Sequence, residues 1–173
     1  MGTLVEISVY EKDKDLAQLA IQNAFDEIQR MEKLMSTHIP TSEISQINQS
    51  AGLRTVSVSP EVLEVIRRAL YWAEQTDGAL DVSIGPVHEL WDFDGDHPAL
   101  PDKNTLAQEL LKVDYRKIQI ENQTVFLMDK GMRLHLGAIA KGYAVDQAIN
   151  ILQDSNIRHA LINAGGDLKT LGK

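Results

Sequence analysis

A strand that turns sharply into a helix is encoded by residues 134–146, which read LHLGAIAKGYAVD. Residues 132–136 have the composition of a strand, and Gly137 follows them at the turn. Glycine accepts backbone angles that other residues avoid, and it lets a chain approach a ligand closely. The helix that begins after this turn directs free N–H groups and a partial positive charge outward, which suits a phosphate group. Lys141, in its first turn, adds a full positive charge.

A second strand with a glycine-rich turn follows at residues 158–167, and its last six residues read INAGGD. The two turns would place a cation, Lys141, and a carboxylate, Asp167, at strand ends. That pairing indicates a site for a phosphate and a metal ion. On spacing alone, however, tight packing turns in an ordinary α/β domain explain both segments equally well.

The rest of the chain alternates helices and strands, with neither an internal repeat nor a linker. Hydrophobic spacing predicts helices from Asp13 or Asp15 to about 35 and over residues 42–47, 60–76, 104–111 and 138–152. It predicts strands over residues 3–10, 118–120, 125–128, 133–136, 160–162 and 168–171. The order of these elements predicts one α/β (α+β) domain over residues 1–173, with a mixed sheet flanked by helices.

Composition narrows the class of protein further. The 173 residues suffice for one domain with a hydrophobic core. The net charge of −8 argues against a nucleic-acid surface, which requires clustered Lys and Arg, but it is compatible with a metal site. The chain has no cysteine, so disulfides, thiolate metal ligands and a cysteine nucleophile are excluded. No apolar run approaches the ~18 residues that a membrane span needs.

Five motifs in a fixed order resemble those of the ApbE family, the FAD:protein FMN transferases. The resemblance covers nearly the whole chain. The motifs are MGT at residues 1–3, STHIPTSEIS at 36–45 with Asn48, TDGALDVSIGP at 76–86, HLGAIAKGYAVD at 135–146 and NAGGD at 163–167.

The resemblance implies covalent flavinylation of another protein. Mg²⁺ would bridge the pyrophosphate of FAD, the hydroxyl of a Ser or Thr on a target protein would attack the FMN-side phosphorus, and AMP would leave. An alternative within the same chemistry is an FAD pyrophosphatase, in which water is the nucleophile and the products are FMN and AMP. A non-catalytic FAD-binding module is a further alternative, as is a fragment that binds no flavin by itself.

The resemblance also assigns roles to individual residues, although it names no catalytic residue. Ala138 would present its backbone carbonyl to Mg²⁺, because hard cations take oxygen ligands whatever the side chain. The positions that would contact or line the pocket of the flavin nucleotide are Met1, His38, Ala79, Leu80, Asp81, His135 and Lys141.

Several of these residues also have a purely structural interpretation. Ala79 and Leu80 could belong to the core, and Asp81 could be a turn or cap carboxylate. Lys141 could be a solvated helix charge, but a cation in the first turn opposes the helix dipole, which favours an anion ligand. Asp167 could tie down the Gly-Gly turn or support a metal ligand.

Two positions depart from the family pattern. His135 replaces the usual Asp, so an obligate acceptor becomes a group that donates, accepts or carries a charge. This change predicts pH-dependent nucleotide affinity. His38 replaces the usual Tyr, which shrinks the aromatic surface and introduces a potential general base. We therefore expect a site more open to water than is usual in the family.

Other polar and aromatic residues suggest ordinary roles. Alternating carboxylates faintly resemble a calcium loop, but the distal Glu of that pattern is absent; they are Asp92, Asp94 and Asp96. Three histidines lack metal-ligand spacing and are expected at the surface or rim, namely His88, His97 and His159. The two tryptophans, Trp72 and Trp91, are expected in the core or at the rim.

The resemblance carries expectations about length and location. ApbE proteins continue well past the point that corresponds to Lys173, so we expect an N-terminal portion of a longer enzyme, without the C-terminal part of the family fold. The absent part would include an Asp and a Thr that ligate the metal. Family members are typically exported, often as lipoproteins, so we expect a periplasmic or cell-envelope protein whose leader has been removed.

Overall fold

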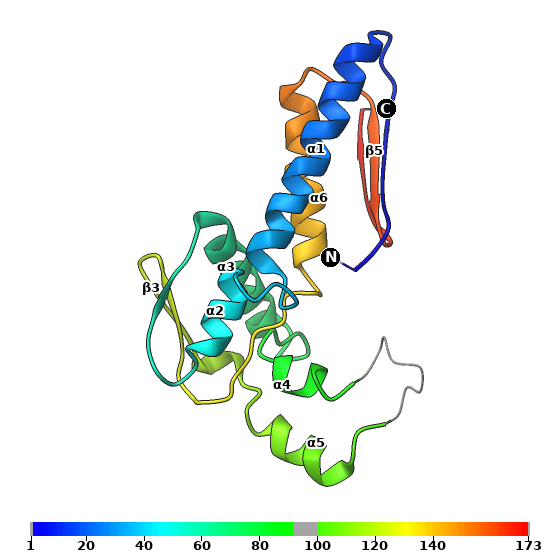
Figure 1. The fold of residues 1–173 in the computed structure, drawn as a ribbon. Coiled ribbons are helices and arrows are strands. Elements are labelled where there is room, and N and C mark those ends of the chain that lie inside the picture. Colours follow the sequence, from blue (N-terminus) through cyan, green and yellow to red (C-terminus); the bar gives the residue numbers. More distant parts are fainter. Residues whose placement is uncertain (1, 92–99, 173) are drawn as a thin grey trace. The chain divides into compact units, whose positions relative to one another are not determined.

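The computed structural model describes residues 2–91 and 100–172, which form two compact units (Figure 1). The first unit combines residues 1–34 with 139–173, and the second unit comprises residues 35–138. The predicted α/β class is confirmed, but two antiparallel three-stranded sheets replace the single mixed sheet. That the chain is one domain stays a prediction. Within the described ranges no helix has both the length and the apolarity to cross a membrane.

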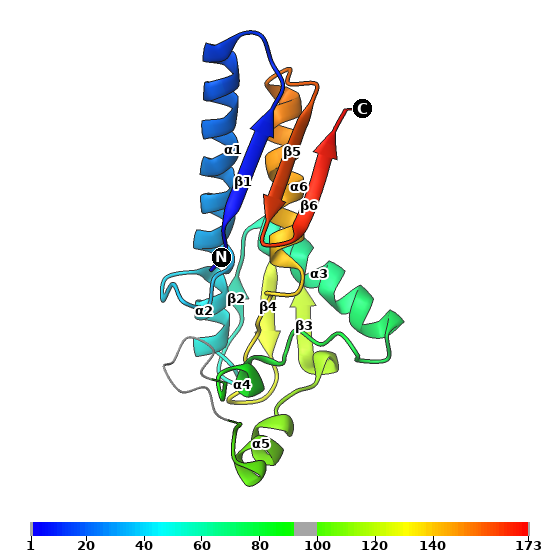
Figure 2. The ribbon, with the colours of Figure 1, turned by 90° about the vertical axis from the view of Figure 1, so that its right-hand side faces the viewer.

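The first unit is a three-stranded sheet with two helices on one face. The strand order is β1-β5-β6, with both pairs antiparallel, and the strands are β1 (Val5–Val9), β5 (Ala160–Ala164) and β6 (Asp167–Leu171). Helices α1 (Lys14–Met35) and α6 (Ala140–Asp154) run side by side along the sheet (Figures 1 and 2). All five elements match predicted ones, with ends that differ by a few residues.

Alternation along the strands explains this arrangement. In β1, Val5, Ile7 and Val9 pack against the core, whereas Glu6 and Ser8 are exposed. Such a period of two gives a sheet one apolar face, and the helices cover that face. The fully buried residues of this core are Ala20, Ala24, Ile28, Val145, Ala148, Ile149, Leu152, Ile157, Ile162 and Ala164.

The second unit combines a small sheet with short helices. The sheet order is β2-β4-β3, from β2 (Val56–Ser57), β4 (Thr124–Leu127) and β3 (Ile118–Glu121), again antiparallel. The helices are α2 (Glu43–Gln49), α3 (Pro60–Gln75), α4 (Gly85–His88), α5 (Lys103–Leu110) and the 3-10 helix η1 (Tyr115–Lys117). Sequence patterns missed β2, α4 and η1, because elements of two to four residues are too short to show a period.

Predicted caps hold the starts of α2 and α3 in the second unit. The Ser42 hydroxyl accepts a hydrogen bond from the Ser45 amide at the start of α2, over 3.0 Å. The Ser59 hydroxyl accepts one from the Val62 amide at the start of α3, over 3.4 Å, and Pro60 occupies the first helical position. Each cap satisfies an amide that a helix start leaves without an intrahelical partner.

The strand predicted over residues 133–136 is wrong. This segment forms a single isolated parallel bridge, between Arg133 and Ile84. The backbone of Leu134 bonds instead to one side chain: Asn48 Nδ2 donates to its carbonyl over 3.0 Å, and Asn48 Oδ1 accepts from its amide over 2.7 Å. The alternating apolar residues that suggested a strand are buried, but at Leu134 a side chain satisfies the backbone in place of a sheet partner.

Candidate functional site

His135 lies beside a second histidine in the second unit. Its ring stacks on that of His88 with centroids 3.8 Å apart and ring planes inclined by 20°. His88 is the last residue of α4, and the His135 amide donates to the carbonyl of Val82 over 2.8 Å. The backbone bond brings residue 135 next to the segment 79–82, so two of the motifs predicted to bind the nucleotide meet here. Sequence reasoning missed the contact between His88 and His135, because one histidine in a four-residue helix has no distinctive spacing.

Gly137 allows the ring of His135 to fold back over the chain. A Cβ atom at position 137 would lie 2.5 Å from His135 Cε1 and 3.1 Å from Nδ1. The glycine therefore leaves room for the ring, which a Cβ at this position would push aside. The Gly137 amide donates to His135 Nδ1 over 3.4 Å.

The surroundings of His135 disfavour its charged form. Burial, followed by the nearby charges of His88 and His38, lowers the pKa of His135 to about 4. Removing a cation from water and placing other cations nearby both oppose protonation. The ring is therefore neutral at pH 7, and with Nδ1 as acceptor its proton resides on Nε2.

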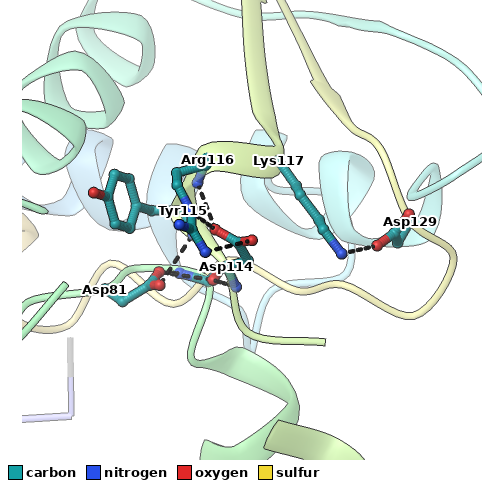
Figure 3. A network of polar contacts seen from close by, with 7 residues as sticks. Asp81, Asp114, Tyr115, Arg116, Lys117 and Asp129 are labelled. Carbon is teal, nitrogen blue, oxygen red and sulfur yellow. Dashed lines mark hydrogen bonds and ion pairs between the residues drawn. The ribbon is translucent and has the colours of Figure 1, made fainter. Parts of the chain in front are cut away.

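The carboxylate of Asp81 ties its own loop to the turn before β3, as Figure 3 shows. It accepts hydrogen bonds from the Ser83 amide and hydroxyl, over 2.8 and 2.7 Å, and from the Tyr115 amide over 3.0 Å. Ser83 in turn accepts from the Asp114 amide over 2.8 Å. Asp81 thus has the turn-fixing role that its sequence position suggested. The amides of Ala79 and Leu80 bond instead to the carbonyl and the hydroxyl of Thr76.

An ion pair continues the same network beyond Asp81 (Figure 3). The Arg116 side chain donates to both carboxylate oxygens of Asp114, over 2.8 and 3.1 Å. These hydrogen bonds hold the pKa of Asp114 below its usual value. Lys117 bonds to Asp129 over 2.6 Å. Solvent reaches both pairs, through the exposed Arg116 in one and through both partly exposed side chains in the other, so each contributes little to stability.

Three of the predicted nucleotide contacts are accessible to a ligand. Ala79 and His38 are exposed, and Leu80 is half-buried. A core role for Ala79 therefore does not apply, and the apolar surface at 79 and 80 remains available for contact. His38 is near enough to His135 to influence its charge.

Lys141 and Asp167 belong to the first unit and approach each other there. Lys141 Nζ lies 3.6 Å from Asp167 Oδ2, with both side chains partly exposed. Lys141 occupies the first turn of α6 as predicted, and the Ile139 cap provides no side-chain hydrogen bond to that helix start. The charge of this lysine is thus partly balanced by a carboxylate, and the helix start offers amides that no capping side chain satisfies.

Ala138 is exposed in the turn that precedes α6. Among residues 2–91 and 100–172, no three His, Asp or Glu side chains are grouped so that they could hold a metal ion. Mg²⁺ commonly uses only one or two protein oxygens and completes its shell with water and substrate phosphates. One backbone carbonyl at Ala138 is compatible with such a site, although it does not define one.

Some sequence predictions fall outside the described residues. Met1 is one of them, and so are the alternating carboxylates Asp92, Asp94 and Asp96 and the nearby His97. Of the remaining aromatic residues, Trp72 is about half exposed on α3, where its ring meets Tyr71 edge to face. His159 meets Tyr10 in the same way in the first unit.

Comparison with known proteins extends the resemblance to the whole chain. The profile of the ApbE family matches residues 1–173. The FAD:protein FMN transferase of Treponema pallidum is 32% identical over 99% of this chain and 50% of its own length. The FAD:protein FMN transferase of Klebsiella pneumoniae is 33% identical over 100% of this chain and 54% of its own length.

Solved structures agree with these matches. The ApbE protein from Thermotoga maritima superposes with a TM-score of 0.89 at 29% identity, over 99% of this chain and 56% of that one. The flavin transferase ApbE from Vibrio cholerae gives a TM-score of 0.87 at 28% identity, over 99% and 57%. The chain spans about half the length of the curated relatives it matches. The profile, the relatives and the fold coincide over its full extent, and the chain belongs to the ApbE family.

Proposed function

We propose that the protein containing this chain transfers FMN from FAD to the hydroxyl of a Ser or Thr on a target protein and releases AMP. The observation that carries this proposal is the match of the entire chain to proteins named FAD:protein FMN transferase, at 32% and 33% identity. The accessibility of Ala79 and Leu80, beside the segment that carries His135, supports it.

In the proposed reaction the hydroxyl oxygen attacks the phosphorus on the FMN side of the FAD pyrophosphate. A new P–O bond forms, the bond to the bridging oxygen breaks, and that oxygen leaves with the electron pair on AMP. The hydroxyl proton passes to a general base. Such a transfer requires neutralised oxygen charge, nucleophile and leaving group held in line, and exclusion of water.

Residues of each unit suit part of this task. In the second unit, Ala79 and Leu80 offer an apolar surface to the flavin nucleotide, and Thr76 bonds to the amides of both. The neutral ring of His135 offers an N–H donor. In the first unit, the uncapped start of α6 and the charge of Lys141 suit an oxygen-rich anion.

The proposal includes Mg²⁺, with the backbone carbonyl of Ala138 as one ligand. When bound, the ion would neutralise charge on the pyrophosphate oxygens. Acidic side chains are not grouped for this purpose in the described residues. The remaining ligands would therefore come from phosphate, water or residues outside the described ranges.

We also propose that the protein works outside the cytoplasm, in the periplasm or cell envelope. Membrane contact would be limited to a lipoprotein anchor. The support for this proposal is family resemblance. Fractionation of cells that express the full-length protein tests it, because recovery in the cytoplasm would contradict export.

The decisive experiment follows FAD, FMN and AMP by chromatography after incubation with Mg²⁺ and a target fragment that carries an acceptor Thr. If FMN is transferred, the amount of AMP released should equal the amount of flavin bound covalently to the fragment. If transfer is the sole reaction, FAD should release no AMP when the acceptor Thr of the fragment is replaced by Val. Chelation of Mg²⁺ should stop the transfer. The full-length protein and residues 1–173 are assayed in parallel.

The same assay separates the alternatives. Free FMN with AMP, independent of the acceptor Thr, would identify an FAD pyrophosphatase. Intact FAD that stays bound with or without Mg²⁺ would identify a binding module. If residues 1–173 leave FAD intact while the FAD:protein FMN transferase of Klebsiella pneumoniae transfers FMN in the same assay, residues 1–173 are not sufficient for the reaction.

A further inference from the structure

The ring of His135 is held by contacts on two structural elements. It stacks on His88 at the end of α4, with centroids 3.8 Å apart. It also lies over Gly137, where an added Cβ would come within 2.5 Å of His135 Cε1 and displace the ring. Two flat contacts of this kind leave the ring little freedom to rotate, so its nitrogen atoms have defined directions.

The hydrogen bond from the Gly137 amide selects one form of this ring. The bond ends on Nδ1, over 3.4 Å, so Nδ1 must carry a lone pair. The neutral ring then holds its proton on Nε2 and presents it as a donor. A second proton would have to enter at Nδ1 and would abolish this bond.

The charged groups around His135 oppose that second proton. His88 and His38 both add positive charge near the ring when they are protonated, and burial adds to the effect. Arg133, two residues earlier, bonds to Glu89 over 2.7 Å. The Asp81 carboxylate is occupied by Ser83 and Tyr115. Among the described residues, no carboxylate pairs with His135 to favour its cation.

We propose that His88 is a positioning residue for flavin-nucleotide binding, which holds the His135 ring neutral and oriented so that Nε2–H donates to an acceptor atom of the nucleotide. The identity of the ligand, a flavin nucleotide, rests on the proposed function. The effect of His88 on the pKa and orientation of the His135 ring is independent of that function. The acceptor is a ribose oxygen or a ring nitrogen, because a donor cannot pair with an exocyclic amine. A carboxylate at position 135 would instead accept a hydrogen bond, from an exocyclic amine or from a ribose hydroxyl.

The first test measures the pKa of His135 in the absence of ligand. In the full-length protein, NMR follows the Cε1–H signal of His135 against pH in wild type, His88→Ala and His88→Phe. His88→Ala removes both the stack and the charge, so the pKa of His135 should rise by about one pH unit or more. His88→Phe keeps a flat ring and should give a smaller rise. An unchanged His135 titration in His88→Ala overturns the positioning role.

The second test measures FAD affinity by flavin fluorescence between pH 5.5 and 8. His88→Ala should weaken binding by roughly tenfold and introduce a further loss below about pH 6, as His135 becomes protonated. His88→Phe should bind within about threefold of wild type. A purely structural role would weaken binding equally at every pH. His159→Ala, in the first unit, is the matched control and should leave both readouts unchanged.

The two tests fail in different ways. Wild-type protein that binds no FAD would overturn the proposed function and the binding role of His88, even if the NMR titration shows the coupled rings. FAD binding that is unaffected by His88→Ala, with a raised pKa of His135 in the same variant, would leave the proposed function standing. That result would overturn the donor role of His135.

Discussion

In the first unit, backbone hydrogen bonds pair the strands β1, β5 and β6 residue by residue. In the second unit, the segment 132–136 has no such partner strand among the described residues. Its central backbone groups bond to the side chain of Asn48. Similar apolar alternation along the sequence thus leads to a sheet in one unit and to an extended segment fixed by a buried amide in the other.

This difference shows where each unit is sensitive to change. A backbone ladder is made by any residue that accepts extended geometry, so the sheet of the first unit depends mainly on which face is apolar. The segment before His135 depends on the identity of single side chains. Specific side-chain hydrogen bonds of this kind fix the position of a ring precisely. When one of them is lost, however, no other group replaces it.

The largest effect is expected in the apolar core of the first unit. Leu152 on α6 is fully buried, so Leu152→Ala should lower the free energy of unfolding by about 2–5 kcal/mol through lost contacts and a cavity. Leu161→Ala is the control, because its side chain lies on the other face of β5 and is 38% exposed. Urea denaturation checks both. Equal losses at the two positions would contradict the assignment of one apolar face.

A loss of stability almost as large is expected when the hydrogen bonds between the Asn48 side chain and the Leu134 backbone are removed. Asn48→Ala leaves the amide and carbonyl of Leu134 buried without their partner, which should cost about 2–4 kcal/mol. The neighbouring Gln49 is exposed, and Gln49→Ala should cost less than about 1 kcal/mol. If hydrogen exchange at the Leu134 amide is as slow in Asn48→Ala as in wild type, the hydrogen bond to Asn48 does not protect that amide.

The fold was predictable from the sequence where a period extends over several turns or strand residues. The long helices α1, α3 and α6 and the strands of the first unit follow directly from apolar spacing and from caps such as Ser59. The false strand at 133–136 has the same cause, because burial of alternate residues occurs with or without a partner strand. Asn48 gives no local sign that it bonds to a residue 86 positions away.

The candidate site was predictable mainly through the family motifs. Those motifs indicated His135 and residues 79–81, but not the contacts among them. The turn-fixing role of Asp81 was anticipated as an alternative, since a carboxylate after Gly commonly bonds to nearby amides. His88 could not be found in this way, because its significance comes from a stack with a residue 47 positions later (135 − 88).

Lowering the pH should decrease the stability of the second unit, because His135 resists protonation in the folded protein. Its pKa of about 4 in the folded protein lies below the ordinary value of 6.5, so the unfolded chain takes up a proton at higher pH. This contribution to stability is complete above about pH 6.5, falls as the pH decreases toward 4, and then levels off. Denaturation at several pH values should show a flatter slope in His135→Phe. His159→Ala should retain the wild-type slope, and a wild-type slope in His135→Phe would contradict the lowered pKa.

The smallest effects come from two glycines that differ in what surrounds them. Gly142 in α6 has no atom within 4 Å of an added Cβ, so Gly142→Ala should stabilise the first unit by about 0.5–1 kcal/mol through helix propensity. Gly137→Ala meets the end of the His135 ring, which can swing away. Its cost in stability should therefore stay below about 1 kcal/mol, while the NMR signals of His135 and His88 shift as the stack is lost. A large loss of stability without a shift in those signals would mean that the backbone, rather than the ring, requires glycine at position 137.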